Sequence, residues 1–201
     1  MKHSIGNKKS AEKQKVFLVH GWESSPQDGW WPWLKKELTN KGFMVAGPKM
    51  PNPSKPAMRE WVKKLRTTVS SPDKNCYFIG HSLGCITILR YIESLGKSQS
   101  IGGAVLVAGF TSNLGYSELD SFFKKEIDWK KIKSRCAKFA AIHSKNDRYV
   151  SLHYGSFFEK KLRAKFLTEE KGGHFTAKDR VKKLPIVLES ILEMMEPAKK
   201  Q

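Results

Sequence analysis

The chain has 201 residues, 39% of them apolar, and its 37 Lys and Arg against 19 Asp and Glu residues give a formal net charge of +18. This length fits one domain that buries roughly 70% of its unfolded surface. No segment is long and apolar enough to span a bilayer, which excludes an integral helical membrane protein. The basic residues are dispersed and accompany no recognisable nucleic-acid module, so we interpret them as a solvated surface, with incidental polyanion binding as the alternative.

Short apolar runs alternate with amphipathic stretches along the whole chain. The predicted strands are Val16–Val19, Phe43–Ala46, Cys76–Ile79, Ala104–Ala108, Phe139–Ile142 and Ala164–Leu167. The predicted helices are Trp31–Asn40, Ala57–Val69, Leu83–Leu95, Trp129–Cys136, Leu152–Lys161 and Pro185–Met195. This alternation predicts an α/β fold, a three-layer α/β/α sandwich around a six-stranded parallel sheet. A ligand is then expected at the carboxyl ends of the strands.

The domain organisation is predicted to be simple. A single domain is expected over residues 15–196, between a flexible basic tail at residues 1–14 and a second tail at residues 197–201. The Pro-rich stretch Pro48–Pro56 is interpreted as a strand-to-helix loop. The segment from Phe110 to Cys136 is long enough for a flap over a site but too short for a separate cap domain.

One motif carries a specific chemistry. Gly80-His81-Ser82-Leu83-Gly84 lies between a predicted strand and a predicted helix, which is the setting of a Gly-x-Ser-x-Gly nucleophile elbow. The turn is so tight that its flanking positions must lack large side chains. The serine is then held in a strained conformation with its hydroxyl above the sheet. Ser82 is therefore the candidate nucleophile.

An acid and a histidine should follow the nucleophile in that order in this type of fold. Asp147 comes just after the strand Phe139–Ile142, and His174 just after the strand Ala164–Leu167. We expect His174 to take the proton of Ser82 and return it to the leaving group. Asp147 would orient the imidazole and stabilise its cationic form.

Other residues compete for these two roles. His143 ends a strand before the acid, which is the wrong order, and Asp179 follows His174 instead of preceding it. Asp120 and Asp128 lie in a Lys-rich segment and not at a strand end. The alternative interpretation makes Asp147 a solvated loop residue and His174 a packing or surface residue.

A tetrahedral oxyanion needs two hydrogen-bond donors. One is expected from the backbone N–H of Leu83, directly after the nucleophile. The loop after the first strand should supply the second, and we assign it to the N–H of Trp22, with Gly21 allowing a close approach. The N–H of Glu23 or Ser24 remains an alternative.

Substrate contacts are expected from Trp22, His81 and Phe110. The tryptophans of the first loop and helix (Trp22, Trp30, Trp31 and Trp33) are interpreted mainly as packing residues, because tryptophan buries a large area. Trp22 is the expected exception, as a wall of the acyl pocket.

The three cysteines, Cys76, Cys85 and Cys136, show neither a disulfide framework nor metal-ligand spacing. This usage suggests a reducing compartment, and the N-terminus lacks the apolar stretch of a signal peptide. A cytoplasmic location is therefore expected.

The stretch from His20 to Leu38, with its Gly-Trp-Glu-Ser-Ser-Pro and Trp-Trp-Pro-Trp-Leu runs, resembles the opening of the retinoblastoma-binding protein 9 family of small serine hydrolases. The resemblance continues through Gly-His-Ser82-Leu-Gly, Asn-Asp147 and Gly-Gly-His174-Phe. It implies an α/β-hydrolase without a cap domain, with Ser82, Asp147 and His174 as its triad and with neither a metal nor an organic cofactor.

One departure from that family matters. Binding of retinoblastoma-type pocket proteins relies on a Leu-x-Cys-x-Glu motif, and the nearest run here, Leu83-Gly-Cys85-Ile-Thr87, has Thr in place of Glu. We therefore expect no such partner. We also expect no specific nucleic acid and no membrane as partners, and a small ester or amide as the substrate. The prediction is a serine hydrolase of the carboxylesterase type. The alternative is a catalytically weak fold that binds an acidic partner.

Overall fold

The computed structural model describes residues 13–196, so most of the two predicted tails, residues 1–12 and 197–201, lies outside the described part. One parallel sheet with the strand order β2-β1-β3-β4-β5-β6 forms the middle of the molecule. Its strands are β1 (Lys15–Val19), β2 (Met44–Ala46), β3 (Cys76–His81), β4 (Ile101–Val107), β5 (Cys136–Ser144) and β6 (Lys165–Glu169). The predicted six-stranded parallel sheet is confirmed.

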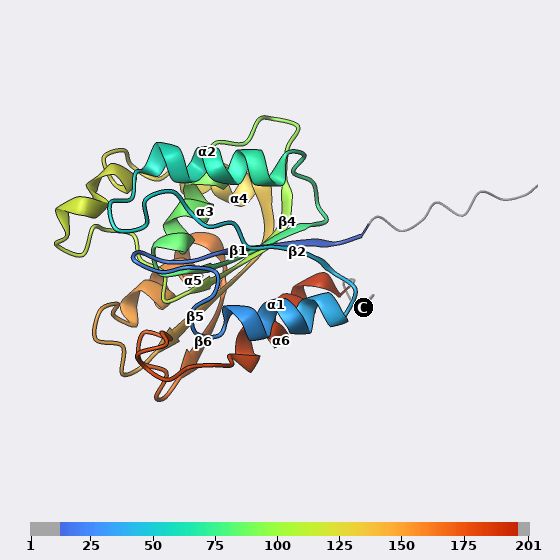
Figure 1. Cartoon of the computed structure of the whole chain (residues 1–201). Coiled ribbons are helices and arrows are strands. Elements are labelled where there is room, and N and C mark those ends of the chain that lie inside the picture. The colour runs from blue at the N-terminus through green and yellow to red at the C-terminus, as the bar shows by residue number, and fades with distance from the viewer. Residues whose placement is uncertain (1–12, 197–201) are drawn as a thin grey trace, which may run out of the picture.

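Helices cover both faces of this sheet (Figure 1). They are α1 (Trp31–Asn40), α2 (Met58–Val69), α3 (Leu83–Glu93), α4 (Trp129–Arg135), α5 (His153–Leu162) and α6 (Pro185–Met195). Helices α1 and α6 pack on one face and the other four on the opposite face, each group over its own apolar cluster. The three-layer α/β/α sandwich is therefore confirmed as well.

Strand β3 shows why the central strands form where they do. All of its residues are buried, and side chains alternate between the two clusters: Phe78 faces α2 and α3, whereas Tyr77 and Ile79 face α1 and α6. A strand covered on both faces is apolar along most of its length, which explains the apolar run from Cys76 to Ile79. Its carboxyl end at His81 leads directly into the elbow.

Helix α2 has the amphipathic pattern expected from its sequence. Trp61, Val62, Leu65 and Val69 are buried against the sheet, and Met58 packs at the edge of the same cluster.

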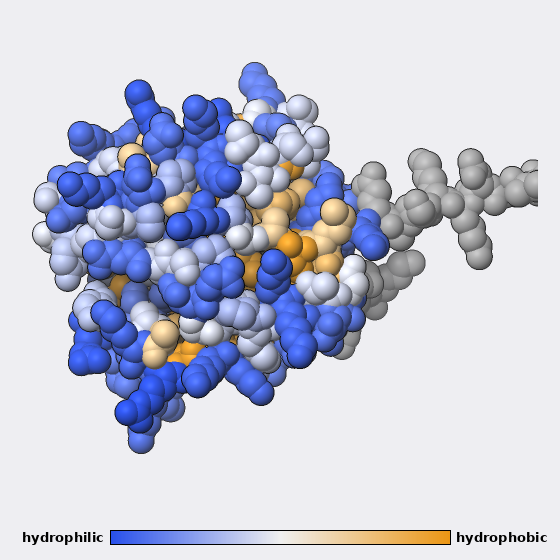
Figure 2. Space-filling model, in the orientation of Figure 1, coloured by the Kyte–Doolittle hydropathy of each residue, from blue (hydrophilic) through white to orange (hydrophobic). Residues whose placement is uncertain are grey.

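The surface of the molecule is mainly polar on the face turned to the viewer. Figure 2 shows mainly hydrophilic residues there, with apolar residues confined to a few patches.

Several boundaries differ from the prediction for identifiable reasons. Strand β4 begins at Ile101, three residues before the predicted start, and includes Gly102 and Gly103. A Cβ at Gly102 would lie 2.4 Å from the carbonyl oxygen of Lys74, so crowding and not turn formation accounts for glycine there. A short 3-10 helix, η1 (Ser117–Phe122), was not predicted. It lies in the segment between β4 and α4, residues 108–128, which we call the flap.

Candidate active site

The sharp turn between β3 and α3 holds Ser82 in a backbone conformation that non-glycine residues rarely adopt, with φ 54° and ψ −120°. The amide of Ser82 donates to the carbonyl of Val107 at 2.8 Å, which ties the turn to strand β4. A Cβ at Gly80 would lie 2.7 Å from Ile88 Cδ1, which explains the absence of a side chain at that flanking position. Strain of this kind persists only where the surrounding structure imposes it.

Ser82, His174 and Asp147 come together in one hydrogen-bonded series. His174 Nε2 lies 3.0 Å from Ser82 Oγ, and His174 Nδ1 lies 2.8 Å from Asp147 Oδ2. The Asp147 side chain is fully buried, and its other oxygen accepts the amides of Tyr149 at 2.8 Å and Val150 at 3.1 Å. A carboxylate oxygen can only accept, so the shared proton sits on Nδ1 and leaves Nε2 free to accept from the serine.

The competing residues have other partners. His143 is buried and its Nε2 donates to the carbonyl of Gly109 at 3.0 Å. Asp128 caps helix α4 by accepting the amide of Lys131 at 2.9 Å, and Asp120 accepts from the side chain of Asn113. Asp179 lies beside His174 but contacts its backbone amide, at 3.1 Å, and not its ring.

The loop after β1 packs directly on the elbow. A Cβ at Gly21 would lie 3.1 Å from Ser82 Cβ, so a larger residue there would push the two loops apart. His20 fixes this loop: its Nε2 accepts the amide of Met50 at 2.9 Å, so its Nδ1 donates to the carbonyl of Gly21, also at 2.9 Å. Burial lowers the pKa of His20, which favours this neutral form.

The expected oxyanion donors lie on these two adjoining loops. The amide of Glu23, one alternative donor, is engaged with the carbonyl of Pro53 at 2.9 Å. The side chain of Trp22 is held by its Nε1, which donates to the carbonyl of Ser54 at 3.2 Å. The assignment of Leu83 and Trp22 as donors stays a prediction.

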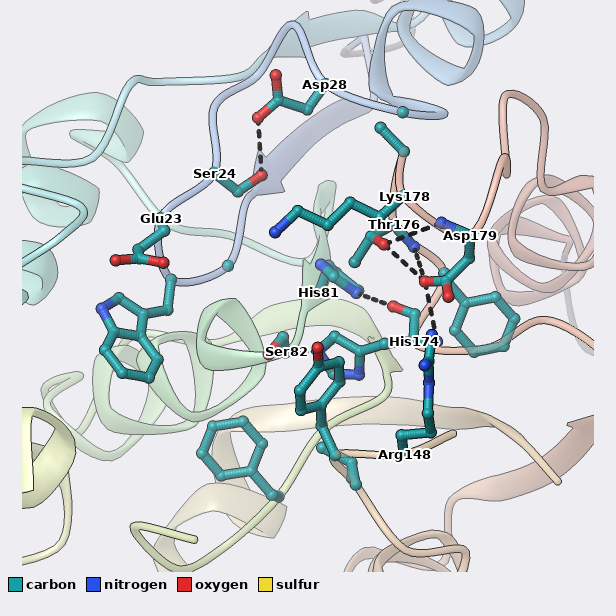
Figure 3. Close-up of a pocket in the computed structure, with 18 of the residues that line it drawn as sticks. Glu23, Ser24, Asp28, His81, Ser82, Arg148, His174, Thr176, Lys178 and Asp179 are labelled. Atoms are coloured by element: carbon teal, nitrogen blue, oxygen red, sulfur yellow. Dashed lines mark hydrogen bonds between the residues drawn. The ribbon is translucent and has the colours of Figure 1, made fainter. Parts of the chain in front are cut away.

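A cavity of about 590 Å³ opens over Ser82 and His174 (Figure 3). The expected substrate contacts Trp22, His81 and Phe110 all line it. Its wall also includes residues that the sequence pattern did not single out, namely Leu114, Tyr116, Leu119, Arg148, Tyr149, Val150 and Lys178. The ring of Tyr149 lies 5.3 Å from that of His174, edge to face. Periodicity could not reveal these residues, because all of them except Leu119 of the short helix η1 lie in irregular loops.

Arg90 of helix α3 holds the flap that supplies one side of this cavity. The arginine is 4% exposed, and its guanidinium donates to the carbonyls of Phe122 at 2.9 Å, of Glu126 at 3.2 Å, and of Lys125. The same guanidinium pairs with Glu93 at 2.7 Å. The flap is therefore anchored to the helix that begins at the nucleophile.

Residues 13–196 contain no cluster of three or more His, Cys, Asp or Glu side chains that could hold a metal ion. The three cysteines are buried and free, and burial raises the pKa of the Cys85 thiol. No helix between residues 13 and 196 has the length and apolar character that a bilayer crossing requires.

Comparison with known proteins gives matches over most of the chain. A family model described as "Serine hydrolase" matches residues 16–193. The chain is 34% identical over 175 residues to YdeN of Bacillus subtilis, covering 87% of this chain and 92% of that protein. It is 28% identical over 150 residues to the serine hydrolase RBBP9 of Rattus norvegicus, covering 73% and 78%. The crystal structure of the B. subtilis ydeN product superposes with a TM-score of 0.86 at 32% identity, over 90% of this chain and 98% of that one.

Proposed function

Because this chain belongs to the serine hydrolase family, we propose that it cleaves small carboxylic esters or amides through an acyl-enzyme intermediate on Ser82. The observation that carries the proposal is the hydrogen-bonded series from Ser82 Oγ through His174 to Asp147. A nucleophile, a base within hydrogen-bond reach and a group that orients the base are the parts that acyl transfer requires.

The proposed reaction has two halves. As Ser82 Oγ attacks the substrate carbonyl carbon, its proton moves to His174 Nε2, and the tetrahedral oxyanion collapses when that proton passes to the leaving alcohol or amine. Water then attacks the acyl-enzyme with His174 as its base, and the carboxylic acid leaves as the proton returns to Ser82. The buried carboxylate of Asp147 stabilises the imidazolium that forms in each half.

The oxyanion would be bound by the amides of Leu83 and Trp22. The close packing of Gly21 on Ser82 brings the loop after β1 to the nucleophile, which supports this assignment. In enzymes of this type, loss of one such donor costs on the order of 3–4 kcal/mol of transition-state stabilisation.

The lining of the cavity favours a small substrate. Its apolar wall combines Trp22 with Phe110, Leu114 and Leu119 of the flap, which suits a small apolar acyl group. Arg90 fixes the flap to helix α3, so we treat this wall as a rigid part of the site. We therefore propose carboxylic esters with short acyl chains as the preferred class, and amides as slower substrates.

Hydrolysis of chromogenic esters and amides with acyl chains of increasing length tests this proposal. We expect turnover by the wild type and loss of turnover in Ser82→Ala and His174→Ala, because each variant lacks the nucleophile or the base. Mass spectrometry should detect a transient acyl adduct on wild-type Ser82. Undiminished turnover by Ser82→Ala, with unchanged folding, would refute the proposed mechanism.

A further inference from the structure

His81, the residue before the nucleophile, makes a hydrogen bond that links the elbow to the loop of the base. Its Nε2 lies 2.7 Å from the carbonyl oxygen of His174, and Figure 3 shows its ring directed at that carbonyl. A carbonyl only accepts, so His81 Nε2 carries the proton and donates. The imidazole is 5% exposed, and burial lowers its pKa to about 3, so the ring is neutral at pH 7.

Two further groups hold the same stretch of backbone. The buried Trp30 donates from its Nε1 to the carbonyl of Phe175 at 2.9 Å. Asp179 accepts the amide of His174 at 3.1 Å, together with the amide and hydroxyl of Thr176. The peptide groups on both sides of the His174 side chain are therefore fixed by groups that lie outside the triad.

The loop that carries His174 is held by turn and side-chain hydrogen bonds: the amide of Phe175 donates to the Gly172 carbonyl at 3.0 Å and the amide of Gly173 to Asn146 Oδ1 at 2.8 Å. Residues 170–184, between β6 and α6, contain neither a helix nor a strand. Gly173 has φ +55° and Phe175 has φ +56°, a left-handed conformation that is costly for phenylalanine. The His174 ring must nevertheless reach both Ser82 and Asp147 at hydrogen-bond distance. Catalytic side chains held this closely depend on surrounding residues that lock their position.

We propose that His81 is a positioning residue, whose Nε2–H fixes the main chain of His174 so that the imidazole bridges Ser82 and Asp147. This inference rests on the proposed function, since it concerns the base of that reaction. His81 is not a second base, because the structure shows its Nε2 donating to a carbonyl and its ring buried.

Three variants test this role. His81→Phe keeps a ring but removes the donor, and His81→Gln replaces it with an amide N–H of similar reach. His153→Phe changes an exposed histidine outside the cavity and serves as the control. Ester hydrolysis and reaction with a neutral fluorophosphonate are measured for each, together with the low-field proton resonance of the His174–Asp147 hydrogen bond.

We expect His81→Phe to lower kcat and the fluorophosphonate reaction rate by about 10- to 100-fold, a larger factor than any change in KM that follows from the position of His81 in the cavity wall. The low-field resonance should broaden or disappear, and His81→Gln should recover most of both losses. His153→Phe should match the wild type. Equal kcat and an unchanged resonance in a folded His81→Phe protein would overturn the inference while leaving the hydrolase proposal intact, whereas an inactive wild type would refute the hydrolase proposal itself.

Should His81→Phe not fold, Trp30→Phe provides a second test, because it removes the neighbouring donor to Phe175 and retains an aromatic ring. A loss of kcat in Trp30→Phe that exceeds any change in KM would support positioning of the His174 loop. Full activity of both Trp30→Phe and a variant His81→Leu would contradict it.

Discussion

Gly84 packs so tightly on Val19 that a Cβ at position 84 would lie 2.1 Å from the Val19 carbonyl oxygen. The contact joins the first turn of the helix after the nucleophile to the strand that leads into the candidate oxyanion loop. A side chain here would displace one backbone from the other, in the part of the molecule where the proposed chemistry takes place.

Gly84→Ala should therefore affect both stability and activity. We expect a loss of about 2–3 kcal/mol in the free energy of unfolding, typical of forced overpacking, and a larger fall in kcat than in substrate binding. Chemical denaturation and ester hydrolysis measure these effects. Gly47→Ala is the control, because its Cβ would meet Leu18 Cβ at an ordinary 3.6 Å. Equal stability of the Gly84→Ala and Gly47→Ala proteins would show that Gly84 does not pack tightly on the Val19 carbonyl.

Asp147→Asn should leave the fold intact and nearly abolish catalysis. The amide would favour the wrong tautomer of His174, a change that lowers kcat by about 10⁴-fold in enzymes with this arrangement. Initial rates of ester hydrolysis provide the measurement. Asp128→Asn, which retains the capping group of helix α4, should have wild-type activity. A fall of less than tenfold in Asp147→Asn would show that this carboxylate does not orient the base.

The buried neutral histidines predict how stability depends on pH. Burial lowers the pKa of His20 and His143, and that of His81 to about 3, below the ordinary value of 6.5. The unfolded chain then binds more protons than the folded one between pH 6.5 and 3. Stability is therefore full above pH 6.5 and falls as the pH drops through that window.

For His81 alone the loss between pH 7 and pH 5 is about 2 kcal/mol. Urea denaturation of the wild type and His81→Gln at both pH values measures this contribution. The variant should lose less stability on acidification than the wild type. An equal loss in both proteins would mean that His81 is not buried in its neutral form.

Arg90 should control the order of the flap. In Arg90→Lys, the single ammonium group cannot donate to all three carbonyls that the guanidinium binds. Glu93 also loses its hydrogen bond to the planar guanidinium. We expect a loss of about 3 kcal/mol in the free energy of unfolding and rapid tryptic cleavage after Lys124 and Lys125. Arg66→Lys, at an exposed position, is the control. Equal cleavage rates in the two variants would contradict the anchoring role.

The sequence predicted the elements with the strongest local signals. Helices Trp31–Asn40 and Pro185–Met195 have the predicted bounds, since each combines a proline in its first turn with apolar residues at helical spacing. Strand β5 instead begins at Cys136, which was predicted to end a helix. Local pattern could not decide this boundary, because pairing with Ile101 of β4 sets it.

The candidate triad could be anticipated because its order and its strand-end positions follow from the fold type. The groups that hold the candidate triad in place could not be anticipated. The contact of His81 with His174 spans 93 positions, and that of Trp30 with Phe175 spans 145. A single sequence contains no local signal for such pairs, and Trp30 was interpreted only as a packing residue. Asp179 was judged by its order relative to His174, although its contact is with the backbone.

Labelling with a fluorophosphonate probe, compared between the wild type, Ser82→Ala and His174→Ala, tests most directly whether Ser82 is an activated nucleophile. We expect one covalent adduct on Ser82 of the wild type, none in Ser82→Ala and strongly slowed labelling in His174→Ala. A well-folded wild type that stays unlabelled would contradict an activated serine. It would favour the alternative of a hydrolase fold that binds an acidic partner.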